Sequence, residues 1–184
     1  MKRAWILVAL LVLSSPVWAT DVNLDPAKWS VGVLGNEDEI GTLLGYKAGK
    51  YTTVGIDGRW YDSLGDTDTE AYSLSAYVAW NAVPEMNIPI GGLFPQVDLP
   101  LPESIRCAIN LGGSIGAIWP QGDKGYDFKD RDALVKVFAE AEFPLSEPAT
   151  LGLRYEYAFD SDRWGKLTDA VPQHAAFLTL KYTF

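Results

Sequence analysis

Apolar and polar side chains alternate one by one along most of this chain. In residues 151–160 the odd positions hold only Leu, Tyr and Phe, whereas the even positions hold Gly, Arg, Glu, Ala and Asp. Successive side chains of an extended strand point to opposite faces, so this period of two predicts a strand with one apolar and one polar face. The pattern recurs in six clear segments and in two weaker ones, at 28–34 and 40–48. It therefore predicts eight strands. The clear segments are 51–61, 72–81, 105–119, 133–143, 151–160 and 176–184.

The connections between these segments fall into two kinds. One kind is polar, charged and mostly longer, and it alternates with a short kind. The polar connections are 36–39, 62–70, 120–130 and 161–172, and the short ones lie near Gly49 and at 144–148. Short turns on the side of the termini and longer loops on the other side are expected of outer-membrane barrels. The pattern therefore predicts an all-β fold, a closed antiparallel up-and-down transmembrane β-barrel.

One connection breaks this alternation. Residues 83–104 fall where a short periplasmic turn is expected, yet they contain five prolines. Proline cannot donate a hydrogen bond to a sheet, so we expect it to keep central strands out of this segment. The segment is interpreted as a long Pro-rich periplasmic connection, or as an irregular extra hairpin that would raise the strand count to ten.

Large aromatic residues on the apolar faces gather near the strand ends, with Val, Ile, Leu and Ala between them. Amphipathic rings favour the boundary between membrane and water, so this placement predicts two aromatic girdles. The periplasmic girdle comprises Trp29, Tyr46, Trp80, Phe143, Tyr182 and Phe184. The external girdle comprises Trp60, Tyr72, Trp119, Tyr157 and Phe159.

The polar faces carry Gly, Ala and Ser with occasional Arg and Glu, which suits a narrow lumen filled by side chains. Strands of about ten residues match the tilted span of an outer membrane, and a sheet in lipid must close to pair its backbone groups. The alternative is a soluble periplasmic barrel or sandwich whose apolar faces point inward.

The first nineteen residues read as a separate targeting segment. Lys2 and Arg3 precede an apolar run at 5–13, and the sequence Val-Trp-Ala ends at Ala19. This predicts a secretory signal peptide at 1–19, cleaved after Ala19, rather than a retained anchor. Removing it leaves 184 − 19 = 165 residues, and 20–184 is expected to be a single barrel domain.

Composition narrows the possible functions. The signal segment carries two of the fifteen basic residues and none of the acidic ones, so the mature charge is 13 − 24 = −11. A surface with this negative charge disfavours the binding of nucleic acid, because phosphate binding needs clustered Lys and Arg. With the single Cys107 and one His there is no internal disulfide and no zinc constellation, and no cofactor is expected. No later stretch of about eighteen apolar residues offers a transmembrane helix.

The chain ends on Leu-Thr-Leu-Lys-Tyr-Thr-Phe, residues 178–184. A terminal aromatic residue after alternating apolar residues resembles the signal that the barrel-assembly machinery reads in small outer-membrane barrels. The whole mature chain resembles that class, which includes the outer-membrane protein A and X types and the opacity proteins. The resemblance implies an eight-stranded barrel in contact with outer-membrane lipid and lipopolysaccharide.

Charged residues on the polar faces would share the lumen. A charge inside a barrel is costly unless it is paired, so we expect a mutually satisfied network. The alternative is the selectivity lining of a small pore. The expected members are Asp57, Arg59, Arg106, Lys136, Glu140, Glu142, Arg154, Glu156 and Lys181.

Two weaker candidates for chemistry lie near the external side. Asp62, Asp66, Asp68 and Glu70 could offer oxygen ligands to Ca²⁺, although their spacing fits no Ca²⁺-loop signature and solvated carboxylates are the simpler reading.

His174 is the second candidate for chemistry near the external side. The small-barrel resemblance brings in lipid A deacylases and palmitoyltransferases, but the deacylases place Ser two residues after their His, where this chain has Ala176. Asp160 and Ser161 could approach His174 from the preceding loop, yet a girdle histidine is the default reading.

The sequence therefore favours a non-enzymatic, monomeric outer-membrane barrel that acts in envelope structure, adhesion or recognition through acidic external loops. The alternatives are a small porin-like channel, a lipid A-modifying enzyme and a soluble periplasmic barrel.

Overall fold

Eight strands account for nearly all of the regular structure. The computed structural model describes residues 28–62, 70–89, 104–121, 132–159 and 171–184. The strands are β1 Trp29–Gly35, β2 Glu39–Lys47, β3 Thr52–Tyr61, β4 Glu70–Pro89, β5 Ser104–Gln121, β6 Asp132–Pro144, β7 Ala149–Ala158 and β8 His174–Thr183. No helix among these residues is long and apolar enough to cross a membrane.

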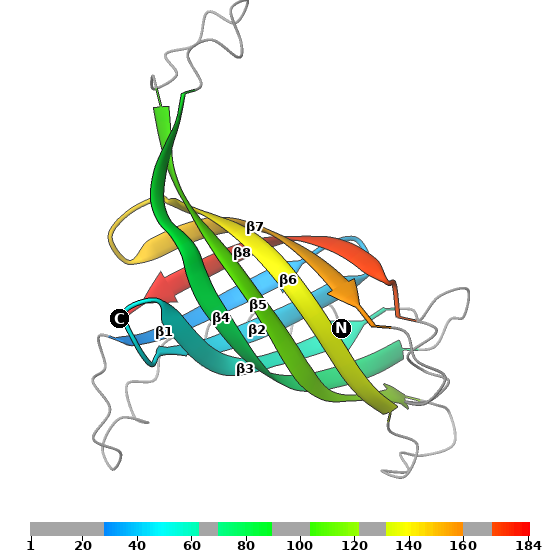
Figure 1. Cartoon of the computed structure of the whole chain (residues 1–184). Coiled ribbons are helices and arrows are strands. Elements are labelled where there is room, and N and C mark those ends of the chain that lie inside the picture. Colours follow the sequence, from blue (N-terminus) through cyan, green and yellow to red (C-terminus); the bar gives the residue numbers. More distant parts are fainter. Residues whose placement is uncertain (1–27, 63–69, 90–103, 122–131, 160–170) are drawn as a thin grey trace, which may run out of the picture.

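The strands form one closed antiparallel barrel in which each strand pairs with its neighbours in the sequence (Figure 1). β1 pairs with β8 and completes the circle, so that Gly32 faces Lys181 and Ser30 faces Thr183. Closure pairs the backbone around the wall, so the strands of the wall itself have no free edge. The predicted fold class is confirmed, with eight strands and not the ten held as the alternative.

The two ends of the barrel differ. β1 begins and β8 finishes at one end, where the amide of Phe184 donates a hydrogen bond to the carbonyl of Trp29 over 3.0 Å. We call this the terminal end, and it also carries the turns between β2 and β3 and between β6 and β7. The opposite end, where β1, β3, β5 and β7 finish, is called the loop end.

Cross-strand register keeps the apolar positions in phase around the wall. Ile56 of β3 pairs with Ala76 of β4, which pairs with Ile115 of β5, and all three side chains are exposed on the outside. One position along, Asp57 pairs with Ser75, and both side chains are buried inside. Because paired residues point to the same side of a sheet, the alternation seen in single strands becomes a continuous apolar outer surface.

β4 and β5 continue beyond the barrel as a two-stranded arm (Figure 1). Pairing extends to Pro89 opposite Ser104, with register irregularities between Asn81 and Val83 and between Val83 and Met86. Within 83–104 the structure adds paired residues at 83–89 and at 104, which form an irregular hairpin that prolongs β4 and β5 and are not extra strands of the wall; residues 90–103 lie outside the described residues. An arm of two strands has only edge strands, and edges and bulges are where a sheet tolerates proline.

Candidate functional site in the barrel interior

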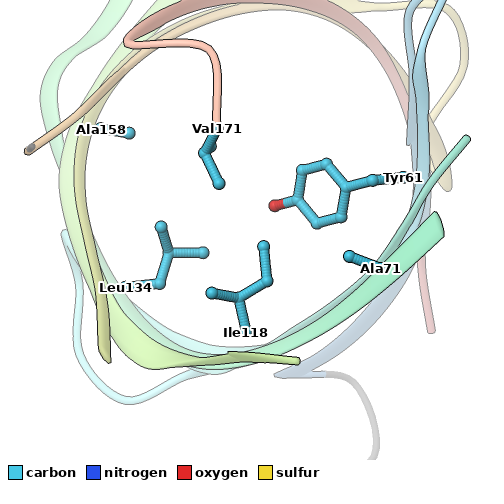
Figure 2. Close-up of a cluster of buried hydrophobic side chains, with 6 residues drawn as sticks. All are labelled: Tyr61, Ala71, Ile118, Leu134, Ala158 and Val171. Carbon is cyan, nitrogen blue, oxygen red and sulfur yellow. The ribbon is translucent and has the colours of Figure 1, made fainter. Parts of the chain in front are cut away.

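An apolar layer crosses the lumen at the loop end. Figure 2 shows six side chains pointing inward from different parts of the wall, and none is more than 5 % exposed. They come from β3 to β7 and from the segment before β8, and they are Tyr61, Ala71, Ile118, Leu134, Ala158 and Val171. We call this layer the outer plug.

Arg59 is the centre of a charged cluster next to the outer plug. Its Nε donates to both carboxylate oxygens of Asp57 at 2.9 and 3.0 Å. Its Nη1 and Nη2 donate to the two oxygens of Glu156 at 2.7 and 2.6 Å, and Nη1 lies 3.4 Å from Glu39. The guanidinium also stacks 4.8 Å from the ring of Phe177. A planar fork with five donors is suited to binding several carboxylates at once.

Two further cations complete this cluster. Lys136 lies 3.6 Å from Glu156 and donates to the hydroxyl of Tyr61 over 3.2 Å. Arg154 places its Nε 2.6 Å from Glu156. With three basic and three acidic members (Glu39, Asp57 and Glu156), the formal charge is 3 − 3 = 0. We call these six residues the inner charge cluster; neutrality and close pairing offset the cost of burying each charge.

A smaller ion-pair group lies toward the terminal end. Lys181 contacts Glu140 and Glu142, each at 2.6 Å, and Thr179 donates to the second oxygen of Glu140 at 2.6 Å. β8 and β6 supply these side chains from different parts of the wall, so the group links strands that are not neighbours. Lys181 is thereby committed to two carboxylates.

Glycine allows aromatic rings to lie flat against the inside of the wall. A Cβ on Gly112 would stand 2.7 Å from Cε2 of Phe138 and 2.5 Å from the carbonyl oxygen of Val78. A real Cβ does not approach other atoms so closely, so the ring occupies space that only glycine leaves free. Phe138 in turn supports the guanidinium of Arg154, which lies 3.6 Å from the ring centre.

The lumen widens at the terminal end into a cavity of about 280 Å³, here called the vestibule. Its deep part is bounded by Tyr77, Phe138 and Arg154, and its mouth carries exposed lysines such as Lys47. The interior therefore has an apolar layer and a neutral ionic layer toward the loop end, and a polar recess toward the terminal end.

Eight of the nine charged residues that the sequence placed in the lumen point into the barrel. Arg106 does not, because it lies on the arm, where it pairs with Asn87 and is exposed. The ribbon of β4 and β5 has left the barrel at this point, so there is no interior for this side chain to face. Glu39 was expected in a loop and instead joins the inner charge cluster. Alternation with the exposed Ile40 was the signal that marks Glu39 as inward.

The remaining candidates are placed as follows. His174 lies outside the barrel, with Nδ1 2.5 Å from the hydroxyl of Tyr155 and its ring 5.0 Å from that of Tyr157. Asp160 and Ser161 lie outside the described residues.

Of the acidic residues considered for Ca²⁺, Asp66 and Asp68 also lie outside the described residues, while Asp62 and Glu70 flank that segment. Among the described residues, no group of three or more His, Cys, Asp or Glu side chains is arranged to hold a metal ion.

No protein-family model matches the chain, and no curated protein matches it. Among solved structures, the chain is similar to Neisserial surface protein A, with 13% sequence identity and a TM-score of 0.46. The match covers 85% of this chain and 94% of that chain.

Proposed function

We propose that the chain is an integral outer-membrane barrel with a closed lumen, and that it acts through its outer surface and loops in envelope structure, adhesion or recognition. The observation that carries this proposal is the reversal of polarity across the wall: charges lie inside and apolar side chains outside. A water-soluble barrel has the opposite arrangement.

The apolar outer surface is broad. Large aliphatic side chains on every strand from β2 to β8 are exposed, among them Ile115 at 65% and Leu178 at 63%. Monomeric soluble proteins rarely expose contiguous apolar patches larger than a few hundred Å². Hydrocarbon chains are the solvent that such a surface needs. The exposed aliphatic residues of the central band include Val54, Ile56, Leu74, Val78, Leu111, Ile115, Val137, Leu153, Leu178 and Leu180.

Aromatic side chains border this band on both sides, as two membrane girdles require. At the terminal end, Trp29 packs on Tyr46 with ring centres 5.1 Å apart, and Tyr182 packs on Phe184 at 5.3 Å. At the loop end, Trp60 pairs with Tyr72, and Tyr72 pairs with Trp119 in a row across three strands. Rings at both rims and aliphatic residues between them support a membrane-spanning orientation.

The filled lumen argues against a pore as the second function. Conduction needs a continuous water-filled path, whereas the outer plug and the inner charge cluster lie across the interior. Eight strands leave an interior just wide enough for side chains. The functional surface is then the outside of the barrel and its loops, and outer-membrane lipid and lipopolysaccharide are the partners that surround it.

Cell fractionation tests the location. We expect the mature chain in the outer-membrane fraction after washing with alkaline carbonate, and we expect unheated samples to migrate differently from boiled ones in detergent gels. Recovery in the soluble periplasmic fraction, with identical migration before and after boiling, would contradict the proposal.

A loop-swap experiment tests the mode of action. Replacing 122–131 with a short Gly-Ser segment leaves all eight strands intact, so the variant is expected to assemble normally. Loss of adhesion or of resistance to envelope stress in this variant, at unchanged barrel levels, supports action through the loops. An unchanged phenotype after replacement of every long external loop would contradict it.

A further inference from the structure

The vestibule is positively charged, although the chain as a whole is acidic. Five basic side chains line it, and they are Lys28, Lys47, Lys50, Arg154 and Lys181. Two acidic side chains, Glu140 and Glu142, line it as well. Arg154 is already balanced within the neutral inner charge cluster, so the remaining charged groups of the vestibule give 4 − 2 = +2. The full sequence carries a formal charge of −9. A recess lined by one sign of charge inside a low-dielectric wall concentrates its field and draws in the opposite charge.

Arg154 is the basic residue of the vestibule that has an unpaired hydrogen-bond donor. It is 1% exposed, and neither its Nη2 nor its Nε has a hydrogen-bond partner within the described part of the chain, although Nε forms an ion pair with Glu156. The Nε faces Glu156 at 2.6 Å, and the ring of Phe138 supports one face of the guanidinium. A buried donor without an acceptor costs free energy, and a guanidinium held in a fixed plane is prepared to receive one.

The other charges of the recess are arranged differently. Lys181 is already paired with Glu140 and Glu142, so it screens these two carboxylates rather than offering a free site. Lys28, Lys47 and Lys50 are exposed at the mouth. Asn81 also lines the recess and has a buried Oδ1 without a partner among the described residues, so a donor group on a ligand would find an acceptor there.

We propose that the vestibule is a binding site for a small oxyanion, a phosphate or carboxylate group, held by Arg154 and attracted by the lysines at the mouth. The cavity of about 280 Å³ lies just below the usual size of small-molecule sites, so it admits a head group or a compact metabolite. The outer plug separates it from the loop end, so the ligand enters and leaves at the terminal end. This inference goes beyond the proposed function and does not depend on it.

Calorimetric titration with inorganic phosphate tests the site in the full-length mature chain, folded in octyl glucoside, a detergent without phosphate or charge. We expect saturable binding of one phosphate per barrel that weakens as ionic strength rises, because the attraction of the exposed lysines is screened. Arg154→Lys keeps the charge but loses the free Nη2, and we expect its phosphate affinity to fall by about tenfold or more. Absence of phosphate binding by the natural sequence would overturn the proposal.

Two further variants separate binding from folding. Lys47→Gln with Lys50→Gln changes only exposed side chains, so the barrel should fold normally while phosphate affinity falls by about threefold and its salt dependence becomes shallower. Arg106→Gln removes one positive charge on the arm, outside the recess, and should leave the affinity unchanged. Equal affinities in the natural sequence, the double lysine variant and Arg106→Gln would overturn the proposal even if Arg154→Lys proved unstable.

The source of the anion is decided by repeating the titration in phosphatidylglycerol nanodiscs. A head group that reaches the vestibule from the neighbouring leaflet competes with free phosphate, and the apparent affinity then drops relative to octyl glucoside. An unchanged affinity assigns the site to a free small anion. Both results keep the oxyanion site and differ only in where its ligand comes from.

Discussion

At the scale of single residues, Arg59 is the buried cation that pairs with the most carboxylates in the described part of the barrel interior. It contacts three carboxylates, and its side chain is fully buried in the ion pairs that it makes. Removing one partner of a buried ionic group leaves the other charges uncompensated, which costs far more than the net value of the intact group.

Arg59→Met should therefore destabilise the barrel by about 3–5 kcal/mol, since Asp57, Glu39 and Glu156 lose their shared partner. Urea titration of the folded protein in detergent, read by the loss of heat-modifiable migration, measures the change. Arg106→Met is the matched control on the exposed arm and should alter stability by less than about 0.5 kcal/mol. Equal effects of the two variants would contradict the central role of Arg59.

Two adjacent glycines of β5 offer a second contrast. Gly112→Ala drives a methyl group into Phe138 and the backbone of Val78, and overpacking of this kind costs about 1–3 kcal/mol. At Gly113, which points outward, the nearest atom to a new Cβ is the carbonyl oxygen of Lys136 at 3.3 Å, so Gly113→Ala should cost clearly less than Gly112→Ala. The same unfolding assay compares them, and a greater loss for Gly113→Ala would refute the packing argument.

At the scale of elements, the arm formed by β4 and β5 stands apart from the closed wall. The last β6 residue that pairs with β5 is Glu142, opposite Ala108, so both edges of the arm beyond this point lack a strand neighbour among the described residues. The bulges near Val83 bend the ribbon away and separate its register from that of the barrel.

The barrel should fold without the arm. Replacing 83–108 with Asn-Gly joins Ala82 to Ile109 through a two-residue turn, the type that suits the right-handed twist of a hairpin. We expect the shortened chain to keep heat-modifiable migration and a β-type circular dichroism spectrum, because the Asn81–Asn110 pair remains and β5 loses only the Ala108–Glu142 pair with β6. Failure of this variant to fold, while Arg106→Met folds normally, would show that the arm is needed for assembly.

At the scale of the whole molecule, the barrel is closed by its side chains. The outer plug is built from β3 to β7 and the segment before β8, and the inner charge cluster is built from β2, β3, β6 and β7. In planar bilayers the purified protein should give no large, reproducible conductance steps. A large porin purified in the same way serves as the positive control, and regular conductance from this barrel would favour the small-pore alternative.

How much of the structure could be predicted from the sequence depends on how far apart in the chain the interacting residues lie. A strand is recognised by alternation between adjacent residues. The face of Leu and Tyr side chains therefore made β7 easy to predict, and Phe184 could be assigned to the end of the final strand. The arm was offered only as an alternative, an irregular hairpin, because proline is judged by local rules, while its tolerance depends on how many strands lie beside it.

The barrel interior also has features that the sequence determined and features that only the tertiary structure decided. By itself the sequence determined the period of two and which side chains share a face, the eight lumen charges among them, because successive side chains of a strand must point to opposite sides. It favoured eight strands with the apolar face outward, and it left ten strands and the soluble arrangement open. Only the tertiary structure decided that Arg106 lies outside, that Glu39 joins Arg59, and that Arg154 keeps a free donor beside a basic recess. Those facts depend on closure and register, which bring together residues nearly a hundred positions apart, such as Arg59 and Glu156, separated by 97.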